Sequence, residues 1–214
     1  MREYFDNQLT ELNNKLIEMG TLVEQAIKNT IKMIIDGDNS GLEDARKHEE
    51  KINSAEKEIQ NFCIKLLLHQ APVAHDLRNV SAALKMITDL ERIGDQAIDI
   101  AEMSEYIKDR TSVINMTHIA EMAEQTSKMV TLAIDAFVKS DLELAKKVSK
   151  RDDKIDDLFD RVKEETVEII HSNKELGTEA IDLMMIAKYL ERIGDHAVNI
   201  AEWVAFSITG SCDI

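Results

Sequence analysis

The stretch "LERIGDQAIDIAE" at residues 90–102 returns almost unchanged as "LERIGDHAVNIAE" at residues 190–202. The two copies agree at ten of thirteen positions, and they start 100 residues apart in a chain of 214. Agreement of this length at this spacing indicates an internal duplication. Each copy carries a glycine and several acids at helical spacing, so the same structure and chemistry are expected once in each half.

The rest of the chain follows a helical plan. Proline occurs once and aromatic residues make up only 4% of the sequence, which suits long helices packed through aliphatic side chains. Apolar residues recur at alternating steps of three and four, the period of a helix buried along one side. These apolar stripes run over residues 9–33, 42–66, 77–101, 119–137, 145–169 and 180–201.

The predicted fold class is therefore all-α, a tandem duplication of two three-helix bundles. The first bundle, with three long helices, is expected over residues 1–110, and the second over residues 111–214. Pro72 suits the first turn of the third helix. Ser140 and Asp141 are expected to end the fourth helix and begin the fifth.

Composition and charge exclude several classes of protein. The formal net charge of −15, with only 26 basic residues, argues against a nucleic-acid partner. No run of about 18 apolar residues predicts a membrane span, and neither end resembles a targeting segment, so a soluble cytoplasmic protein is expected. Cys63 and Cys212 form neither a disulfide framework nor a CxxC site, and both are expected to be structural or incidental.

Acids interrupt the apolar stripes at positions where a hydrophobic residue is expected. Those at matching places in the two halves are Glu49, Glu91, Asp152 and Glu191. Glu49 and Glu91 are each 21 residues from Gln70, so in an antiparallel hairpin with its turn at Gln70 they are expected at the same height along the two helices. By the same reasoning, a turn near His171 places Asp152 at the height of Glu191. Each stripe acid is therefore expected to be partly buried and to face another acid.

Further acids follow one turn later on the same helix faces, as Asp95, Asp156 and Asp195, and Asp99 and Glu102 extend the first set. Clustered carboxylates repel, so they need a proton or a compensating cation. Hard oxygen ligands without cysteine suit divalent or trivalent metal ions, among them iron, manganese, magnesium, calcium and zinc. The candidate metal ligands are Glu49, Glu91, Asp95, Asp99, Asp152, Asp156, Glu191 and Asp195.

A structural alternative is that basic side chains pair with these acids. The candidate partners are Arg46, Arg92, Arg151, Arg192 or a lysine. Because Arg92 and Arg192 follow the stripe acids by one residue, they point about 100° away and are expected to pair across a neighbouring helix. Gly94 and Gly194 indicate close approach of the helices beside the acids. His196 is either an added ligand or a surface or interface histidine.

At these residues the sequence resembles the PhoU family of regulators of bacterial phosphate uptake. The resemblance rests on an "ERIGD" helix in each half and on "PVAHDLR" at residues 72–78. It implies a six-helix tandem bundle that binds multinuclear metal clusters, including iron, through Glu91 with Asp95, Glu191 with Asp195, and Asp152 with Asp156. Asn53 and Asn199 depart from the pattern, so the two halves are expected to bind metal unequally.

The resemblance further implies a non-enzymatic regulator, often a homodimer, that damps the phosphate-starvation response. Its implied partners are a sensor histidine kinase and the ATPase of a phosphate ABC transporter, through which it would reach the membrane peripherally. An accessory protein of a low-affinity phosphate transporter has the same fold and is an alternative. A carboxylate di-iron protein needs two Glu-x-x-His motifs, of which only Glu168 with His171 is present. A purely structural adaptor would carry no stoichiometric metal.

Overall fold

The fold is known from a computed structural model that describes residues 2–37, 41–69, 74–107, 114 and 117–213. In these ranges the chain forms long helices and no strand. The helices are α1 (Arg2–Asp36), α2 (Leu42–His69), α3 (Ala74–Ser104), α5 (Ile119–Lys139), α6 (Leu142–Ser172) and α7 (Gly177–Thr209), with a short 3-10 helix, η2 (Lys174–Leu176). The all-α prediction and the six long helices are confirmed.

Helix ends follow the local chemistry of the sequence. Ser140 adopts a left-handed conformation with φ 48° after α5, and the Asp141 side chain accepts hydrogen bonds from the first backbone amides of α6. At the other end of α6, Asn173 caps η2. The predicted break at Ser140 and Asp141 is therefore confirmed, whereas Pro72 lies outside the described residues.

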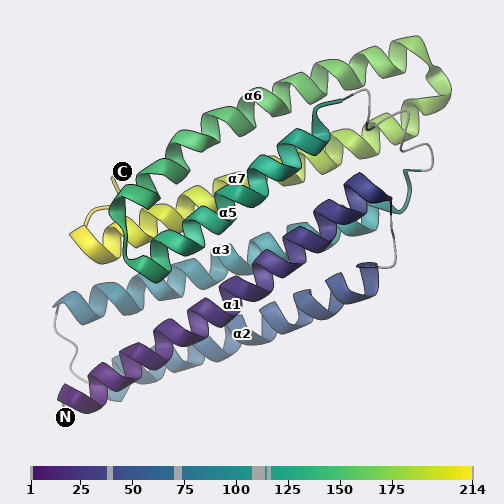
Figure 1. Ribbon diagram of the computed structural model, residues 1–214. Coiled ribbons are helices and arrows are strands. Elements are labelled where there is room, and N and C mark those ends of the chain that lie inside the picture. The colour runs from purple at the N-terminus through teal and green to yellow at the C-terminus, as the bar shows by residue number, and fades with distance from the viewer. Residues whose placement is uncertain (1, 38–40, 70–73, 108–113, 115–116, 214) are drawn as a thin grey trace.

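The helices form two bundles that share one core (Figure 1). Helices α1, α2 and α3 pack together, as do α5, α6 and α7, and α3 lies against α7 along the join. Buried apolar residues of all six helices belong to one connected cluster. The predicted tandem bundles are therefore present, but they are fused through their repeated helices. The predicted boundary between residues 110 and 111 lies outside the described residues and stays a prediction.

Helices α3 and α7 run antiparallel, as Figure 1 shows. The Lys85 ammonium near the start of α3 lies 5.9 Å from the ring centroid of Trp203 near the end of α7. This arrangement places the two "LERIGD" segments side by side in the middle of the molecule. Of the described helices, none combines the length and hydropathy that a membrane crossing requires.

Both cysteines are free thiols, as predicted. Cys63 is fully buried, and burial raises the pKa of its thiol to about 12. Burial, with the negative charges of Glu202 and Asp213, also raises the pKa of Cys212. Both shifts disfavour the reactive thiolate at neutral pH, which agrees with a structural role.

Candidate functional site

Each repeated glycine lies where two helices approach closely. A Cβ atom added at Gly94 would lie 3.0 Å from the Cδ1 atom of Ile52 on α2. One added at Gly194 would lie 3.4 Å from Oδ1 of Asp152 and 3.6 Å from Cγ2 of Ile155, both on α6. The predicted close approach is present in both halves, and it is tighter in the first.

The register of both hairpins differs from the prediction. The prediction placed Asp152 at the level of Glu191. In the structure Asp152 lies beside Gly194, about one turn further along α7. The reason is the position of the turn. Since α6 ends at Ser172 and α7 begins only after η2, the midpoint of the hairpin lies beyond His171.

The first half shows the same displacement. Ile52, three residues after Glu49, faces Gly94, three residues after Glu91. Helix α2 ends at His69 and α3 begins at Ala74, so the midpoint lies beyond Gln70. Because the helices are antiparallel, Glu49 and Glu91 lie on opposite sides of this contact, and their predicted pairing at one level is wrong by nearly two turns.

Four half-buried acids form what we call the first acidic face, on α2 and α3. They are Glu49, Glu56, Glu91 and Asp95. Burial raises the pKa of Glu91, and the charges of Asp95, Glu56 and Glu49 raise it further, while Arg92 opposes them. Glu49 accepts a hydrogen bond of 2.5 Å from Nδ2 of Asn53.

Glu56 was not among the predicted ligands. Its position in the apolar stripe of α2 was the feature of the sequence that could have indicated it. The stripe puts Glu56 on the same side of the helix as Glu49, two turns further along. In the register that the structure shows, Glu56 lies opposite Glu91. Because the register was predicted incorrectly, Glu56 was not predicted to belong to the first acidic face.

Arg92 stays on its own helix. Its Nε lies 3.5 Å from Oε2 of Glu91, and its Nη1 lies 3.6 Å from Oδ2 of Asp95, with 57% of the arginine side chain exposed. The prediction that it pairs across a neighbouring helix is wrong, because a long side chain can curl back along the helix surface. Such exposed pairs contribute little to stability.

The second acidic face consists of Asp152 and Asp156 on α6 with Glu191 and Asp195 on α7. Burial and the neighbouring charges of Asp156 and Asp195 raise the pKa of Asp152 to about 6. The pKa values of Asp156 and Asp195 are also raised, first by burial and next by the charge of Glu191. These four carboxylates therefore lie close enough to disfavour one another's ionisation.

Lys188 is the cation of the second acidic face. Its Nζ contacts Oε2 of Glu191 and lies 5.3 Å from the centroid of the Phe159 ring on α6. Its positive charge also opposes the raised pKa values of Asp156 and Asp195. The ammonium is therefore held between the two helices that carry the acids.

Asp99 faces α7 instead of α2. Its carboxylate hydrogen-bonds Tyr189, and burial together with Asp95 and Glu102 raises the pKa of Asp99. It lines a hollow of about 330 Å³ with Arg46 and Glu102, which form an ion pair of 2.9 Å. Of the predicted ligands, Asp99 is thus the one that the structure places at the join between the halves.

The same join holds His196. Its Nδ1 lies 2.9 Å from Oδ1 of Asp89, which also accepts a hydrogen bond of 3.1 Å from Asn199. Asp89 and Asn199 are the counterparts, 100 residues away, of Tyr189 and Asp99. The duplication therefore brings the same two positions together twice. Asp89, which is only 8% exposed, was not predicted, because no pattern within α3 indicates a partner on α7.

In the described part of the chain, no three His, Cys, Asp or Glu side chains are grouped closely enough to hold a metal ion. The acids are nevertheless gathered on two helix pairs, and their oxygens are the ligands that hard cations prefer. The seven predicted ligands other than Asp99 lie on the two acidic faces, and whether they bind metal stays a prediction.

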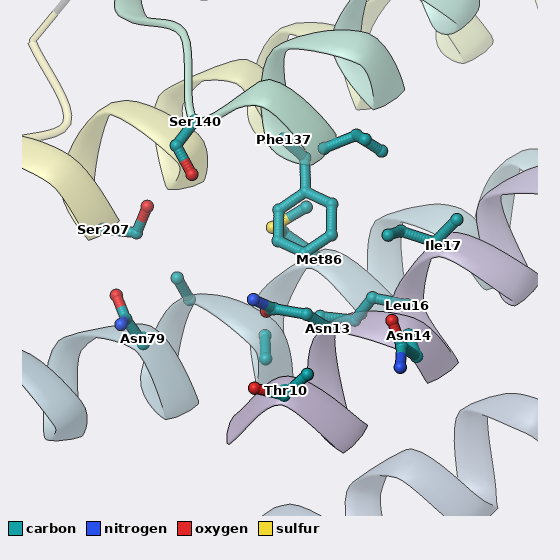
Figure 2. Close-up of a pocket in the computed structure, with 13 residues that line it drawn as sticks. Thr10, Asn13, Asn14, Leu16, Ile17, Asn79, Met86, Phe137, Ser140 and Ser207 are labelled. Atoms are coloured by element: carbon teal, nitrogen blue, oxygen red, sulfur yellow. The ribbon is translucent and has the colours of Figure 1, made fainter. Parts of the chain in front are cut away.

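A cavity away from both faces lies between the two halves (Figure 2). It has a volume of about 290 Å³, and Figure 2 shows Asn13 and Asn79 on one side with Ser140 and Ser207 on the other. No charged residue occurs among the described residues that line it. The sequence did not indicate this cavity, because its walls come from four helices.

The duplication and the two fused bundles agree with comparisons to known proteins. The PhoU domain matches the chain twice, over residues 16–104 and 119–204. The chain belongs to the PhoU family. A Clostridium acetobutylicum relative named "phosphate-specific transport system accessory protein PhoU homolog" is 34% identical over 98% of this chain and 96% of its own length.

Solved PhoU structures extend the likeness to the whole fold. The crystal structure of PhoU from Pseudomonas aeruginosa superposes with a TM-score of 0.90 at 31% identity, covering 97% of this chain and 100% of that one. The phosphate transport system regulatory protein PhoU from Streptococcus pneumoniae gives a TM-score of 0.85 at 25% identity, covering 98% and 99%. The resemblance inferred from the "ERIGD" helices is confirmed.

Proposed function

We propose that this chain is a non-enzymatic regulator of phosphate uptake and of the phosphate-starvation response. The observation that carries the proposal is the match over essentially the full length to PhoU proteins named as accessory or regulatory proteins of phosphate transport. The net charge of −15 supports a protein partner over a nucleic acid.

The proposed mode of action is that of an adaptor. A homodimer in the cytoplasm would contact the ATPase of a phosphate ABC transporter and a sensor histidine kinase, and would report transporter activity to the kinase. Support comes from the PhoU family resemblance and from the words "accessory protein" and "transport system" in the relatives' names. The same names favour this proposal over an accessory protein of a low-affinity transporter.

The two acidic faces are the proposed sites for divalent or trivalent metal ions. Glu49, Glu91 and Asp95 would supply oxygens in the first half, and Asp152, Asp156, Glu191 and Asp195 in the second. The donor chemistry fits iron, manganese, magnesium, calcium or zinc, because all of these groups are carboxylates that repel one another. A bound ion would neutralise this repulsion and link the two helices of each hairpin.

The di-iron alternative has little support from the structure. Glu168 and His171 are exposed near the end of α6, more than two turns beyond Asp156. They are therefore poorly placed to share an ion with the acids of the second face.

A reporter experiment tests the regulatory role. In a bacterium that lacks its own PhoU protein, this chain is expected to restore repression of a phosphate-starvation promoter in phosphate-rich medium. A variant with Glu91→Gln, Asp95→Asn, Glu191→Gln and Asp195→Asn should fail to repress although it accumulates to the same level. Full repression by the variant would disconnect the acidic faces from regulation, and absence of repression by the unmodified chain would count against the regulatory role.

Metal analysis of the untagged purified chain tests the metal proposal separately. Stoichiometric metal, removed by a chelator and restored by one of the ions named above, is expected. A metal-free chain that takes up none of them would support the purely structural adaptor.

A further inference from the structure

The cavity between the two halves is walled by uncharged side chains of four helices. We propose that it is a docking site for a partner protein, in which an extended, uncharged segment of the partner inserts one aliphatic side chain between α1, α3, α5 and α7. The inference rests on the adaptor role proposed above and is independent of the proposed metal sites. It assigns to that role a surface to which both halves contribute.

The apolar part of the cavity lies at its base. Leu16, Ala83 and Met86 line it and are each only 2% exposed. Figure 2 shows Phe137 and Met86 in the middle, between the polar groups of the two sides. The volume of about 290 Å³ is near the lower limit of about 300 Å³ for small-ligand pockets. One aliphatic side chain with its adjoining peptide groups is an occupant of this size.

Hydrogen-bonding groups without partners surround this base. The side-chain amides of Asn13, Asn14 and Asn79 line the cavity and make no hydrogen bond with other described residues. Each amide offers a donor and an acceptor, as a peptide group does. The Ser207 hydroxyl donates to the backbone carbonyl of Val204 at 2.7 Å, so its oxygen is left as an acceptor. The backbone of an extended segment matches this mixture, because its peptide groups supply both donors and acceptors.

The absence of charge distinguishes this end of the join from the other end. Through the 100-residue repeat, Asn79 and Ala82 correspond to Glu179 and Asp182. Burial and the charge of Glu179 raise the pKa of Asp182. Neutral walls in a chain with a net charge of −15 are complementary to an uncharged segment, because a charged side chain would lose hydration there without gaining an ionic partner.

The other end of the join shows which kind of residue fills such a place. The two carboxylate contacts between α3 and α7 are related by the repeat, so the two ends of the join correspond to each other. Ser207 at one end therefore corresponds to Ile107 at the other. Ile107 is only 3% exposed and belongs to the core. The chain buries its own isoleucine at one end and leaves a cavity at the other.

The difference between the ends arises at the start of each half. The PhoU domain match begins at residue 16 within α1, but at residue 119, where α5 begins. Helix α1 thus extends about four turns before the matched part, and Asn13 and Asn14 of this extension line the cavity. In the second half, the segment that precedes α5 contains Ile107 instead. The extension of α1 builds a wall at the first end and leaves room for a segment of another protein.

The binding test uses a neutral blocked amino acid as the probe. N-acetyl-isoleucine N-methylamide is titrated into the full-length chain, and the methyl resonances of methionine and isoleucine are followed by NMR. The Met86 and Ile17 methyls should shift with a dissociation constant on the order of millimolar, as expected for a ligand of this size. Met185, exposed near the opposite end of α7, should not shift. The blocked derivatives of glycine and aspartate should bind at least about tenfold more weakly.

Ser207→Ile introduces the residue of the other end of the join and fills the cavity. The variant should melt at the same temperature as the unmodified chain or higher. It should bind the probe at least about tenfold more weakly and fail to repress the phosphate-starvation promoter. Ser207→Ala, the matched control, leaves the cavity open and should retain both binding and repression. Asn79→Leu, which fills the cavity from α3, should reproduce the effects of Ser207→Ile even if that variant folds poorly.

Absence of shifts at Met86 and Ile17 would overturn the proposal. Binding of uridine, a neutral heterocycle, at least about tenfold more tightly than the blocked isoleucine would also overturn it, since the cavity would then be a small-molecule site. Repression by a folded Ser207→Ile variant that no longer binds the probe would overturn the docking role while leaving the regulator intact. If the unmodified chain did not repress either, the proposed regulatory function would fail, and the docking role with it.

Discussion

The two acidic faces descend from one duplicated unit, yet they balance their charges differently. The first face has Asn53 beside Glu49, and its arginine, Arg92, is exposed and lies along its own helix. The second has Asp156 at the equivalent place and a lysine held between the helices. Each half thus keeps the same acids on α3 or α7, while the partner helix has changed. Duplication preserves a backbone arrangement more strictly than it preserves the electrostatics built on it.

The difference also shows in the carboxylates next to the glycines. Asp152 lies against Gly194, and its pKa is raised to about 6 by burial and by three neighbouring aspartates and a glutamate. In the first half the contact at Gly94 is made by Ile52, and Glu49 has an amide donor instead of a second acid. Ionisation is therefore disfavoured at Asp152, whereas its counterpart Glu49 has a hydrogen-bond donor beside it.

Neutralising one acidic face at a time is expected to have the largest effect on metal binding. Glu91→Gln with Asp95→Asn is expected to weaken metal binding by the first face at least about 100-fold, because outer-shell changes alone cost 10–100-fold. Glu191→Gln with Asp195→Asn should do the same to the second face only. Metal content by elemental analysis, with titration of each variant, measures both. Full metal content in either double variant would show that the ligands lie elsewhere.

Metal removal is expected to have the next largest effect. At a free ion concentration about 100 times the dissociation constant, binding stabilises the folded chain by about 2.7 kcal/mol. Chelation should therefore lower the melting temperature by about 5–10 °C while leaving the helical content unchanged. Calorimetry before and after chelation provides the measurement. An unchanged melting temperature after verified removal would exclude a stabilising ion.

Larger side chains at the two glycines are expected to destabilise the two hairpins by different amounts. Gly94→Leu and Gly194→Leu are both expected to destabilise the fold by about 1–3 kcal/mol, because a bulky group would wedge the helices apart. The cost should be higher at Gly94, where even a Cβ would lie 3.0 Å from Ile52.

The alanine variants at the same positions provide the control. At Gly194 the contact of 3.4 Å is ordinary, so Gly194→Ala should be more stable than Gly94→Ala through its gain in helix propensity. Denaturant unfolding measures all four variants. Equal stability of the two alanine variants would show that the closer approach at Gly94 has no energetic consequence.

The smallest expected effect is the pH dependence that Asp152 gives to the metal-free chain. Because its folded pKa of about 6 lies above its ordinary value of 3.8, the folded state binds this proton more tightly than the unfolded state. The free energy of unfolding therefore falls as pH rises from about 4 to about 6 and stays lower above it. Asp152→Asn should raise the melting temperature at pH 7.5 by about 2–4 °C, since solvent screening limits the gain to about 1 kcal/mol.

Glu49→Gln is the matched control, at the equivalent place in the first half. Here the carboxylate accepts a hydrogen bond from Asn53, so neutralising it weakens a favourable contact and should give a smaller gain or none. Melting curves of both variants in chelator, at several pH values between 4 and 8, make the test. A larger gain from Glu49→Gln would reverse the assignment of repulsion to the second face.

Much of this protein was determined by local sequence patterns. The steps of three and four predicted six helices, because burial of one side imposes the helical period on the apolar residues. The exact repeat of "LERIGD" predicted the duplication, and acids within the apolar stripes predicted where charge would be partly buried. Gly94 and Gly194 predicted close approach, since a glycine inside a helix weakens it without such a contact.

Tertiary structure alone decided how the halves and the hairpins meet. The level of Asp152 against Gly194 depends on where the turn between α6 and α7 has its midpoint, and an error of two or three residues there displaces every facing pair by about one to two turns. The contacts of Asp89 with His196 and of Asp99 with Tyr189 join helices 100 residues apart. No periodicity within one helix encodes such contacts, because they depend on the antiparallel packing of α3 against α7.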